Sequence, residues 1–229
     1  MQFIHLLYDR QGFRALNHPE KCFSTEAFRR DCQSRQLCGR KDLMLRVILH
    51  TDHFMILPQQ ASSHDFFQLH FPQSSHITAL PLGDGLQNIV FESDPALREL
   101  AESLFPIHSL LPDSLLFARY AMRNGGKGLS LLAYYRPEQL QLFVVEDRKL
   151  IFANGFSVKD IEDARYFLMA VRQQFSIESV CHFCQDYGDG GEAQALCDYL
   201  GSYFRQVSQH KLCDDNALPF IENISDIQI

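Results

Sequence analysis

The sequence predicts an α+β protein whose two halves share an order of elements, and three observations lead to this class. Residues 129–207 read as three short strands, a helix, a strand and a second helix. Residues 3–37 open in a similar way, with a hairpin, a short third strand and a helix. The glycine-rich run 124–128 lies between the two segments, and such runs mark loops. The chain is therefore expected to divide there.

This order of elements is how a ribonuclease-H-like domain is built, and each half of an actin-like (ASKHA) protein follows it. We therefore predict two ribonuclease-H-like halves of a divergent actin-like fold. The N-terminal half is expected over residues 1–123 and is irregular, the linker over 124–128, and the C-terminal half over 129–229. The similarity between the halves is one of order, since no residue-level repeat accompanies it.

Apolar periodicity and turn residues place the elements of the first half. Gly83 and Gly85 mark a hairpin turn, and Pro95 suits the first position of a helix. The expected order is strands at 3–7, 13–16 and 21–23, a helix at 25–37, strands at 43–50 and 54–57, a helix at 62–69, a hairpin at 77–82 and 86–91, and helices at 96–105 and 112–122.

The second half shows a clearer pattern. An apolar stripe at Ile161, Ala164, Leu168 and Val171 indicates a helix with one buried face. The expected order is strands at 129–135, 140–145 and 150–153, a helix at 158–175, a strand at 179–184, a helix at 192–207 and a last strand at 210–213. The segment after Asp214 is left unassigned.

Composition excludes several classes of function. A net charge of −7 and a pI near 5.8 argue against general nucleic-acid binding, which needs a basic face. The basic cluster at 29–41 is expected to be a solvated helix face or a modest anion patch. The seven cysteines lack the spacing of a disulfide framework, and no apolar run approaches the roughly 20 residues that cross a bilayer. We expect a cytoplasmic protein with reduced thiols and no membrane span.

Nucleotide binding in an actin-like protein would need two hairpin turns and a glycine-rich loop that approach phosphate. The first turn offers Asp9 and Gly12, although its late glycine also suits an ordinary hairpin. The second turn, 136–139, has neither Asp nor Gly, and its proline lacks a backbone donor. The loop 188–191 is glycine-rich but is surrounded by acids that repel phosphate.

The nucleotide-binding candidates are therefore restricted to two segments, and the sequence supports no cofactor. The candidate residues are Asp9, Gly12, Gly188, Gly190 and Gly191. No Ser-His-Asp grouping or nucleophile motif is present, so no catalytic residue is predicted.

Metal binding has weak support. Cys181 and Cys184 have CxxC spacing, but on a strand they point to opposite faces, so buried apolar thiols are the favoured interpretation. His50 and His53 flank a strand end and are favoured as turn residues over metal ligands. No metal site is predicted.

Short motifs in the second half resemble a known family. The run Leu150-Ile151-Phe152-Ala153-Asn154-Gly155-Phe156, followed by Asp163-Ala164-Arg165-Tyr166, is similar to the DUF3822 family of uncharacterised Bacteroidetes proteins, as are Phe54-Met55-Ile56-Leu57-Pro58 and Leu104-Phe105-Pro106. The resemblance implies a divergent actin-like fold of the PilM type without an assigned activity. It implies structural roles for Asn154, Phe156, Asp163 and Tyr166, with Phe156 and Tyr166 packing the helix on the sheet.

Three functions compete at this point. The leading hypothesis is a non-catalytic protein-binding or scaffold protein that kept the fold and lost the phosphate loops. The alternative is a weak ATP-binding enzyme or switch of the PilM type, and the third is a metal or redox protein using Cys181 and Cys184. The sequence specifies neither the identity of a protein partner nor an oligomeric state.

Overall fold

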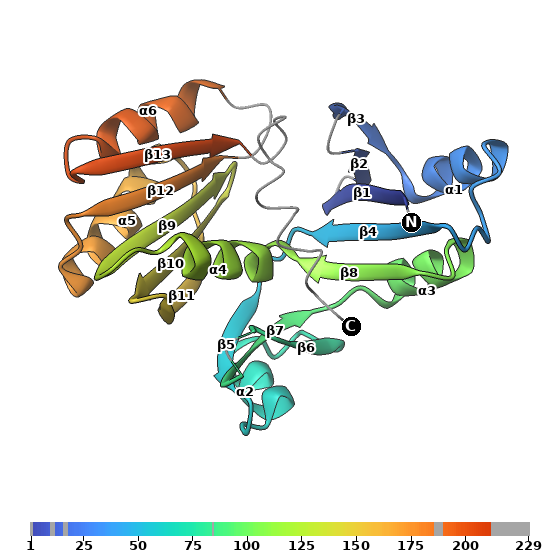
Figure 1. Cartoon of the computed structure of the whole chain (residues 1–229), viewed down its shortest axis with the longest axis horizontal. Helices are drawn as coiled ribbons and strands as arrows, with labels where there is room; N and C mark the ends of the chain where they lie inside the picture. The colour runs from blue at the N-terminus through green and yellow to red at the C-terminus, as the bar shows by residue number, and fades with distance from the viewer. Residues whose placement is uncertain (1, 10–11, 16–17, 84, 186–189, 212–229) are drawn as a thin grey trace.

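The computed structural model describes residues 2–9, 12–15, 18–83, 85–185 and 190–211. Within these residues it contains two five-stranded sheets, a smaller three-stranded sheet and six helices (Figure 1). The two large sheets lie at opposite ends of the molecule, and the small sheet lies below the junction between them in Figure 1.

The first large sheet has the strand order β3-β2-β1-β4-β8. β1 pairs antiparallel with β2 and parallel with β4, and β4 pairs parallel with β8. The strands are β1 (Gln2–Asp9), β2 (Gly12–Ala15), β3 (His18–Phe23), β4 (Leu43–Leu49) and β8 (His108–Pro112).

The second large sheet repeats this order as β11-β10-β9-β12-β13. β9 pairs antiparallel with β10 and parallel with β12, which in turn pairs parallel with β13. The strands are β9 (Leu129–Arg136), β10 (Gln139–Glu146), β11 (Lys149–Ser157), β12 (Val180–Gln185) and β13 (Gln206–Lys211). The chain thus forms two halves of one topology, as the sequence predicts.

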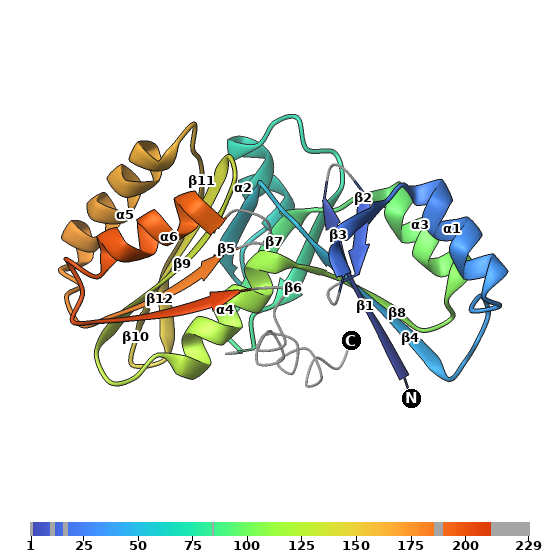
Figure 2. The ribbon, with the colours of Figure 1, turned by 90° about the horizontal axis from the view of Figure 1, so that it is seen from above.

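Two helices cover one face of each large sheet (Figure 2). In the first half these are α1 (Thr25–Ser34) and α3 (Pro95–Leu104), and in the second half α5 (Ile161–Phe175) and α6 (Gly190–Leu200). Capping residues fix where they begin, because the first N–H groups of a helix have no partner within it. The side chains of Ser24, Asp94 and Asp160 accept such bonds at α1, α3 and α5.

The small sheet is an insertion between β4 and α3, with the strand order β5-β7-β6. It contains β5 (Phe54–Pro58), β6 (Ile77–Pro81) and β7 (Gln87–Glu92), with α2 (Ser63–His70) packed on it. Leu57, Phe67 and Val90 form its own small core. This insertion accounts for the irregular first half.

The remaining helix, α4 (Asp113–Asn124), joins the halves. It follows β8 directly, yet its Phe117 ring stacks on Tyr134 of β9 at 4.1 Å and lies 6.4 Å from Phe143 of β10. One cluster of buried apolar residues therefore runs from the first sheet through α4 into the second. This cluster joins the two halves, because burial of such side chains is the main driving force for folding. A second cluster lies within the second half, under α5 and α6.

Several sequence-based boundaries differ from the structure. The strand expected at 150–153 continues to Ser157, the helix expected at 25–37 ends at Ser34, and the helix expected from residue 158 begins at Ile161.

Two further differences concern whole segments. No strand is expected at residues 108–112, where β8 lies, and α4 begins one residue later than expected. The helix expected to reach residue 207 ends at Leu200, and β13 follows at Gln206–Lys211. Both segments become strands by parallel pairing with strands that are distant in the sequence, and the local sequence pattern does not predict such pairing.

Candidate functional site

A buried polar network lies at the junction of the two halves, centred on Asp113 at the first turn of α4. The Asp113 side chain is fully buried. Its Oδ2 lies 2.9 Å from Nδ1 of His50, and its Oδ1 accepts bonds from the Thr51 hydroxyl at 3.0 Å and the Ser114 backbone N–H at 2.7 Å. A buried carboxylate is tolerated only when its oxygens are satisfied in this way.

The second half completes this network through β9 and β10. The amide Nε2 of Gln141 donates to Oδ1 of Asp113 at 3.2 Å and to the carbonyl of Thr51 at 3.2 Å. Nε2 of Gln139 donates to the same carbonyl at 3.0 Å. The hydroxyl of Tyr134 lies 3.4 Å from His50 Nδ1. Side chains from both halves thus meet around residues 50 and 51.

The electrostatics of this network favour the ionised carboxylate. Burial alone would raise the pKa of Asp113, but the hydrogen bond and charge of His50, the charge of Arg136 and the bond from Gln141 together hold that pKa below its usual value. Asp113 therefore carries its negative charge inside the junction at neutral pH.

The β9–β10 turn is fastened to the first half. Nη2 of Arg136 donates to Oδ1 of Asp52 at 2.6 Å, and Arg136 also donates through Nε to the side chain of Gln139. The two halves touch again at Gly155 of β11, where a Cβ would lie 3.3 Å from the carbonyl oxygen of Asp52 and 3.3 Å from the ring of Phe54. The β9–β10 turn is therefore held against the first half by its side chains.

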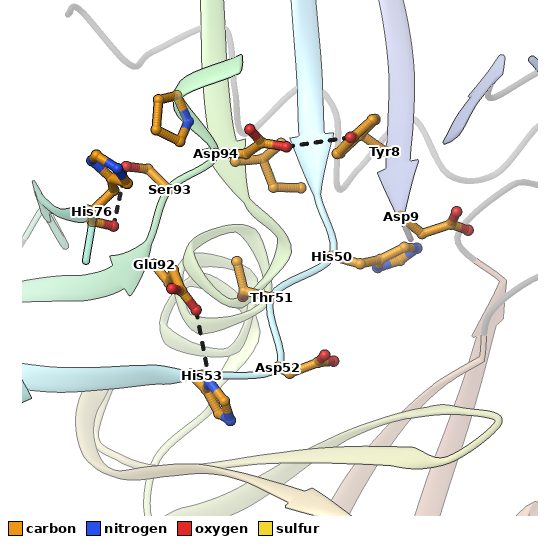
Figure 3. Close-up of a pocket in the computed structure, with 12 residues that line it drawn as sticks. Tyr8, Asp9, His50, Thr51, Asp52, His53, His76, Glu92, Ser93 and Asp94 are labelled. Atoms are coloured by element: carbon orange, nitrogen blue, oxygen red, sulfur yellow. Dashed lines mark hydrogen bonds and ion pairs between the residues drawn. The ribbon is translucent and has the colours of Figure 1, made fainter. Parts of the chain in front are cut away.

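A pocket of about 450 Å³ opens next to this junction, between the ends of β1 and β4 and the β7–α3 connection (Figure 3). Its lining includes the carboxylates of Asp9, Asp52, Glu92 and Asp94 together with three histidines, and it has no Lys or Arg. Tyr8 donates to Asp94 at 3.3 Å, and His53 lies 3.9 Å from Glu92. Among the described residues, no group of three His, Cys, Asp or Glu side chains has an arrangement that holds a metal ion.

A second hollow, of about 410 Å³, lies between the edge strands β5 and β11. Its lining combines apolar side chains with the polar His70, Gln87 and Asn154 and contains no Asp, Glu, Lys or Arg. Ile151 lies at a register shift between β10 and β11 and is 44% exposed. Such bulges redirect side chains at sheet edges.

The structure brings together only part of the predicted nucleotide site. Asp9 ends β1 and lines the first pocket, and its Oδ1 accepts the backbone N–H of Gly12 at 3.1 Å. Its Oδ2 accepts from Arg14 at 3.2 Å. Gly190 and Gly191 open α6, and Gly188 lies outside the described residues.

Other sequence-based interpretations can be compared directly with the structure. Cys181 is buried in the core under α5 and α6, and Cys184 in the core shared with α4, so the two thiols do lie on opposite faces of β12. Phe156 packs on Phe167 of α5 at 4.4 Å. Tyr166 does not pack on the sheet as expected, because it lies on the outer face of α5 with 69% of its surface exposed.

Sequence reasoning did not find the central residues of the junction. The sequence predicts a turn residue at His50 and a helical residue without a functional role at Asp113. Gln139 and Gln141 carry the one local signal, since they lie on the same face of an otherwise apolar strand and are both buried. Polar side chains at such positions require partners.

Comparison with known proteins agrees with this architecture. A Bacteroides thetaiotaomicron protein with an actin-like ATPase fold and unknown function is 14% identical, with 98% of this chain and 96% of that chain covered and a TM-score of 0.75. The PilM–PilN type IV pilus biogenesis complex is 10% identical, with 73% and 68% covered and a TM-score of 0.45. The apo psk41 ParM protein is 10% identical, with 86% and 67% covered and a TM-score of 0.36.

The first of these likenesses shows that the two halves form an actin-like fold. In the described part of the chain, none of the helices has both the length and the apolar character needed to span a membrane. No curated protein matches this chain. The family model described as "Protein of unknown function (DUF3822)" matches residues 26–207, which is well over half of the sequence. The chain therefore belongs to the DUF3822 family.

Proposed function

We propose that this protein is a non-catalytic, protein-binding or scaffold member of the actin-like group. The observation that carries the proposal is the attachment of the β9–β10 turn to the first half, through Arg136 with Asp52 and Gln139 with the Thr51 carbonyl. A turn that grips phosphate must present free backbone N–H groups. This turn instead uses its side chains to close the junction.

The chemistry of the same turn opposes phosphate binding. Pro137 has no N–H to donate, and Glu138 adds a negative charge. The carbonyl of Glu138 accepts the backbone N–H of Val158 at 3.0 Å. Both ends of the turn are therefore held by protein groups.

The candidate residues of the first turn have structural roles. A Cβ at Gly12 would lie 2.3 Å from the carbonyl oxygen of Phe23, and its φ is +131°, so the close approach of β3 requires glycine. Asp9 accepts bonds from Gly12 and Arg14. These contacts explain an Asp and a Gly in this turn without any ligand.

The start of α6 carries an acid where an anion would bind. Glu192 lies in its first turn and accepts a bond from the Tyr135 hydroxyl at 2.9 Å. A carboxylate there complements the positive end of the helix dipole. A phosphate approaching the same end would meet this charge.

The protein-binding part of the proposal is supported by the groove between β5 and β11. Its lining combines apolar side chains, among them Met55, Phe71 and Ile151, with polar ones and has no Lys or Arg. One wall belongs to each half, and the halves meet beside it, where Gly155 approaches Asp52 and Phe54. A groove of mixed apolar and polar lining without a cation suits a protein segment better than a polyphosphate.

Thermal unfolding of the full chain with millimolar ATP–Mg²⁺ and ADP–Mg²⁺ tests the proposal. A ligand that binds only the native state at a hundredfold excess over its Kd adds about 2.7 kcal/mol of stability. For a chain of this size that corresponds to a rise in Tm of roughly 5–10 °C. The proposal predicts no rise. A rise that Gly190→Asp abolishes would replace it with the alternative, nucleotide binding by Asp9, Gly12 and the 188–191 loop.

A further inference from the structure

The face of the first sheet that turns away from α1 carries a row of three polar side chains. The ring of Phe13 stacks on Phe28 of α1 at 4.5 Å, and Phe13 pairs with Tyr8 of β1. Because side chains alternate along a strand, His5 points to the opposite face. The parallel register places His5 of β1 beside Arg46 of β4, and Arg46 beside Ser109 of β8.

On the same face of the sheet, this polar row lies between a row of buried residues and a row that is partly exposed. The buried row lies two residues further along each strand and consists of Leu7, Ile48 and Leu111, with exposures of 0–1%. In the partly exposed row, Phe3 is 44% exposed. Within the polar row, Arg46 is 6% and Ser109 is 3% exposed. The row therefore marks the edge of the core.

One polar atom of each residue in the row is buried without a partner. Nδ1 of His5, Nε of Arg46 and Oγ of Ser109 have no hydrogen-bond partner in the part of the chain that the structure describes. No ion pair joins Arg46 to a carboxylate of the described residues, and its guanidinium instead lies 4.1 Å from the centre of the Phe3 ring. Burying a cation without a counter-charge is costly, so folding stability alone does not explain an arginine here.

The charge at this row is a single positive one. Burial, and then the charge of Arg46, lower the pKa of His5 to about 4, so His5 is neutral at pH 7. Burial also lowers the pKa of Arg46, which nevertheless remains protonated. The row thus offers one cation, one neutral imidazole and one hydroxyl beside the exposed ring of Phe3.

We propose that this row is a carboxylate-binding site, at which Arg46 receives an Asp or Glu side chain from an apolar segment of a partner protein. A planar guanidinium matches a carboxylate in geometry and charge. Ser109 and His5 flank the incoming group, and Phe3 contacts the apolar neighbour of the acid. The inference rests on the proposed protein-binding function and specifies the chemistry of one partner segment.

The row favours a peptide carboxylate over a nucleic acid. Binding to a phosphate backbone needs several cations, because affinity grows with the number of phosphates neutralised. This row has one cation, next to an exposed aromatic ring, in a chain with a net charge of −7. A short acidic and apolar segment complements both features.

A displayed library of random dodecapeptides, selected on the full chain and counter-selected on Arg46→Met, tests the proposal. Methionine keeps the length and apolar stem of Arg46 but removes its charge. Arg35→Met is the matched control, because Arg35 is an exposed arginine already paired with Asp31 at 3.0 Å. Affinities of the selected peptides, labelled with fluorescein, are then measured by fluorescence anisotropy.

The proposal predicts peptides that carry Asp or Glu next to apolar residues and that bind Arg46→Met at least tenfold more weakly. They should bind Arg35→Met like the parent, and Arg46→Lys with intermediate affinity. The Tm of Arg46→Met should equal or exceed that of the parent, because an unpaired buried charge is removed. This stability readout separates a binding residue from a structural one.

Three results would overturn the proposal. One is the absence of peptides that depend on Arg46, and another is a lowered Tm for Arg46→Met with unchanged binding. The third is a large gain in affinity when Asp214, Asp215, Glu222 and Asp226 are replaced by their amides, since the chain's own acids would then be the competing occupant. A rise in Tm on addition of nucleotide would contradict the proposed function but would not affect the test of peptide binding at Arg46.

Discussion

Nδ1 of His50 and Oδ2 of Asp113 lie 2.9 Å apart inside the junction, although 63 positions separate the two residues in the sequence. His50 follows β4 and Asp113 opens α4, so the pair joins the end of a central strand to the helix that connects the halves. Gln141 and Tyr134 of the second half contact the same pair. The junction is therefore closed by polar contacts around a shared apolar core.

Replacement of Asp113 by asparagine is expected to destabilise the protein strongly. Asparagine replaces one carboxylate oxygen with an N–H donor, so a buried hydrogen-bond partner of Asp113 loses its acceptor, which costs about 1–3 kcal/mol. Denaturant unfolding of Asp113→Asn against the parent measures this loss. Asp65→Asn is the control, because Asp65 is 80% exposed and should change stability by less than about 0.5 kcal/mol. Equal stability of the two variants would contradict the structural role of the network.

Gly12 is expected to be required for folding rather than for ligand binding. Alanine at this position combines a φ of +131° with a clash against the carbonyl oxygen of Phe23. We therefore expect the free energy of unfolding to fall by about 1–3 kcal/mol. At Gly126 a Cβ meets nothing within 4 Å, and Gly126→Ala should be neutral or slightly stabilising. Thermal unfolding of both variants without ligand decides the point. Native-like stability of Gly12→Ala would refute this account of the first turn.

His5 should make stability depend on pH in the acidic range. Its folded pKa is lowered from 6.5 to about 4, so between these values the unfolded chain takes up a proton that the folded chain does not. Its contribution is complete above about pH 6.5 and is lost as the pH falls toward 4. The Tm of His5→Gln should therefore fall less than the Tm of the parent when the pH is lowered from 7 to 5. The other histidines are present in both proteins, so parallel pH profiles would argue against a buried neutral His5.

The two cysteines of β12 should resist modification in the native protein. Burial raises the pKa of both Cys181 and Cys184, and the thiolate is the reactive form. Cys22 is exposed and serves as the internal reference. Mass-spectrometric mapping after iodoacetamide treatment should show label on Cys22 and, only after unfolding, on Cys181 and Cys184. Early labelling at position 181 or 184 would mean that β12 opens locally.

The sequence predicts most of the fold because the halves are built from strongly patterned local elements. The stripe at Ile161, Ala164 and Leu168 identifies α5, although the helix is expected from residue 158 and begins at Ile161, after the capping residue Asp160. β8 escapes prediction because its five residues closely follow Pro106 and end in Pro112, and they become a strand only by pairing with β4. Local propensity contains no information on that pairing.

The junction is less predictable than the fold because its residues come from four separated segments. Nothing near Asp113 in the sequence identifies His50 or Gln141 as a partner. The paired glutamines of β10 show that a buried polar group lies nearby, but not which one. Tyr166 is expected to pack on the sheet, but its neighbour Phe167 does so instead. Adjacent aromatic residues on a helix face different sides, and only packing decides which side is buried.

The central claim is that contacts between the halves close the junction where a nucleotide-binding relative would grip phosphate. Hydrogen exchange of the full chain, followed by mass spectrometry over residues 48–54 and 134–142, tests it most directly. The account predicts strong protection of both segments without ligand and the same protection with millimolar ATP–Mg²⁺. Weak protection that rises on addition of ATP–Mg²⁺ would contradict it, because the junction would then be an open nucleotide site.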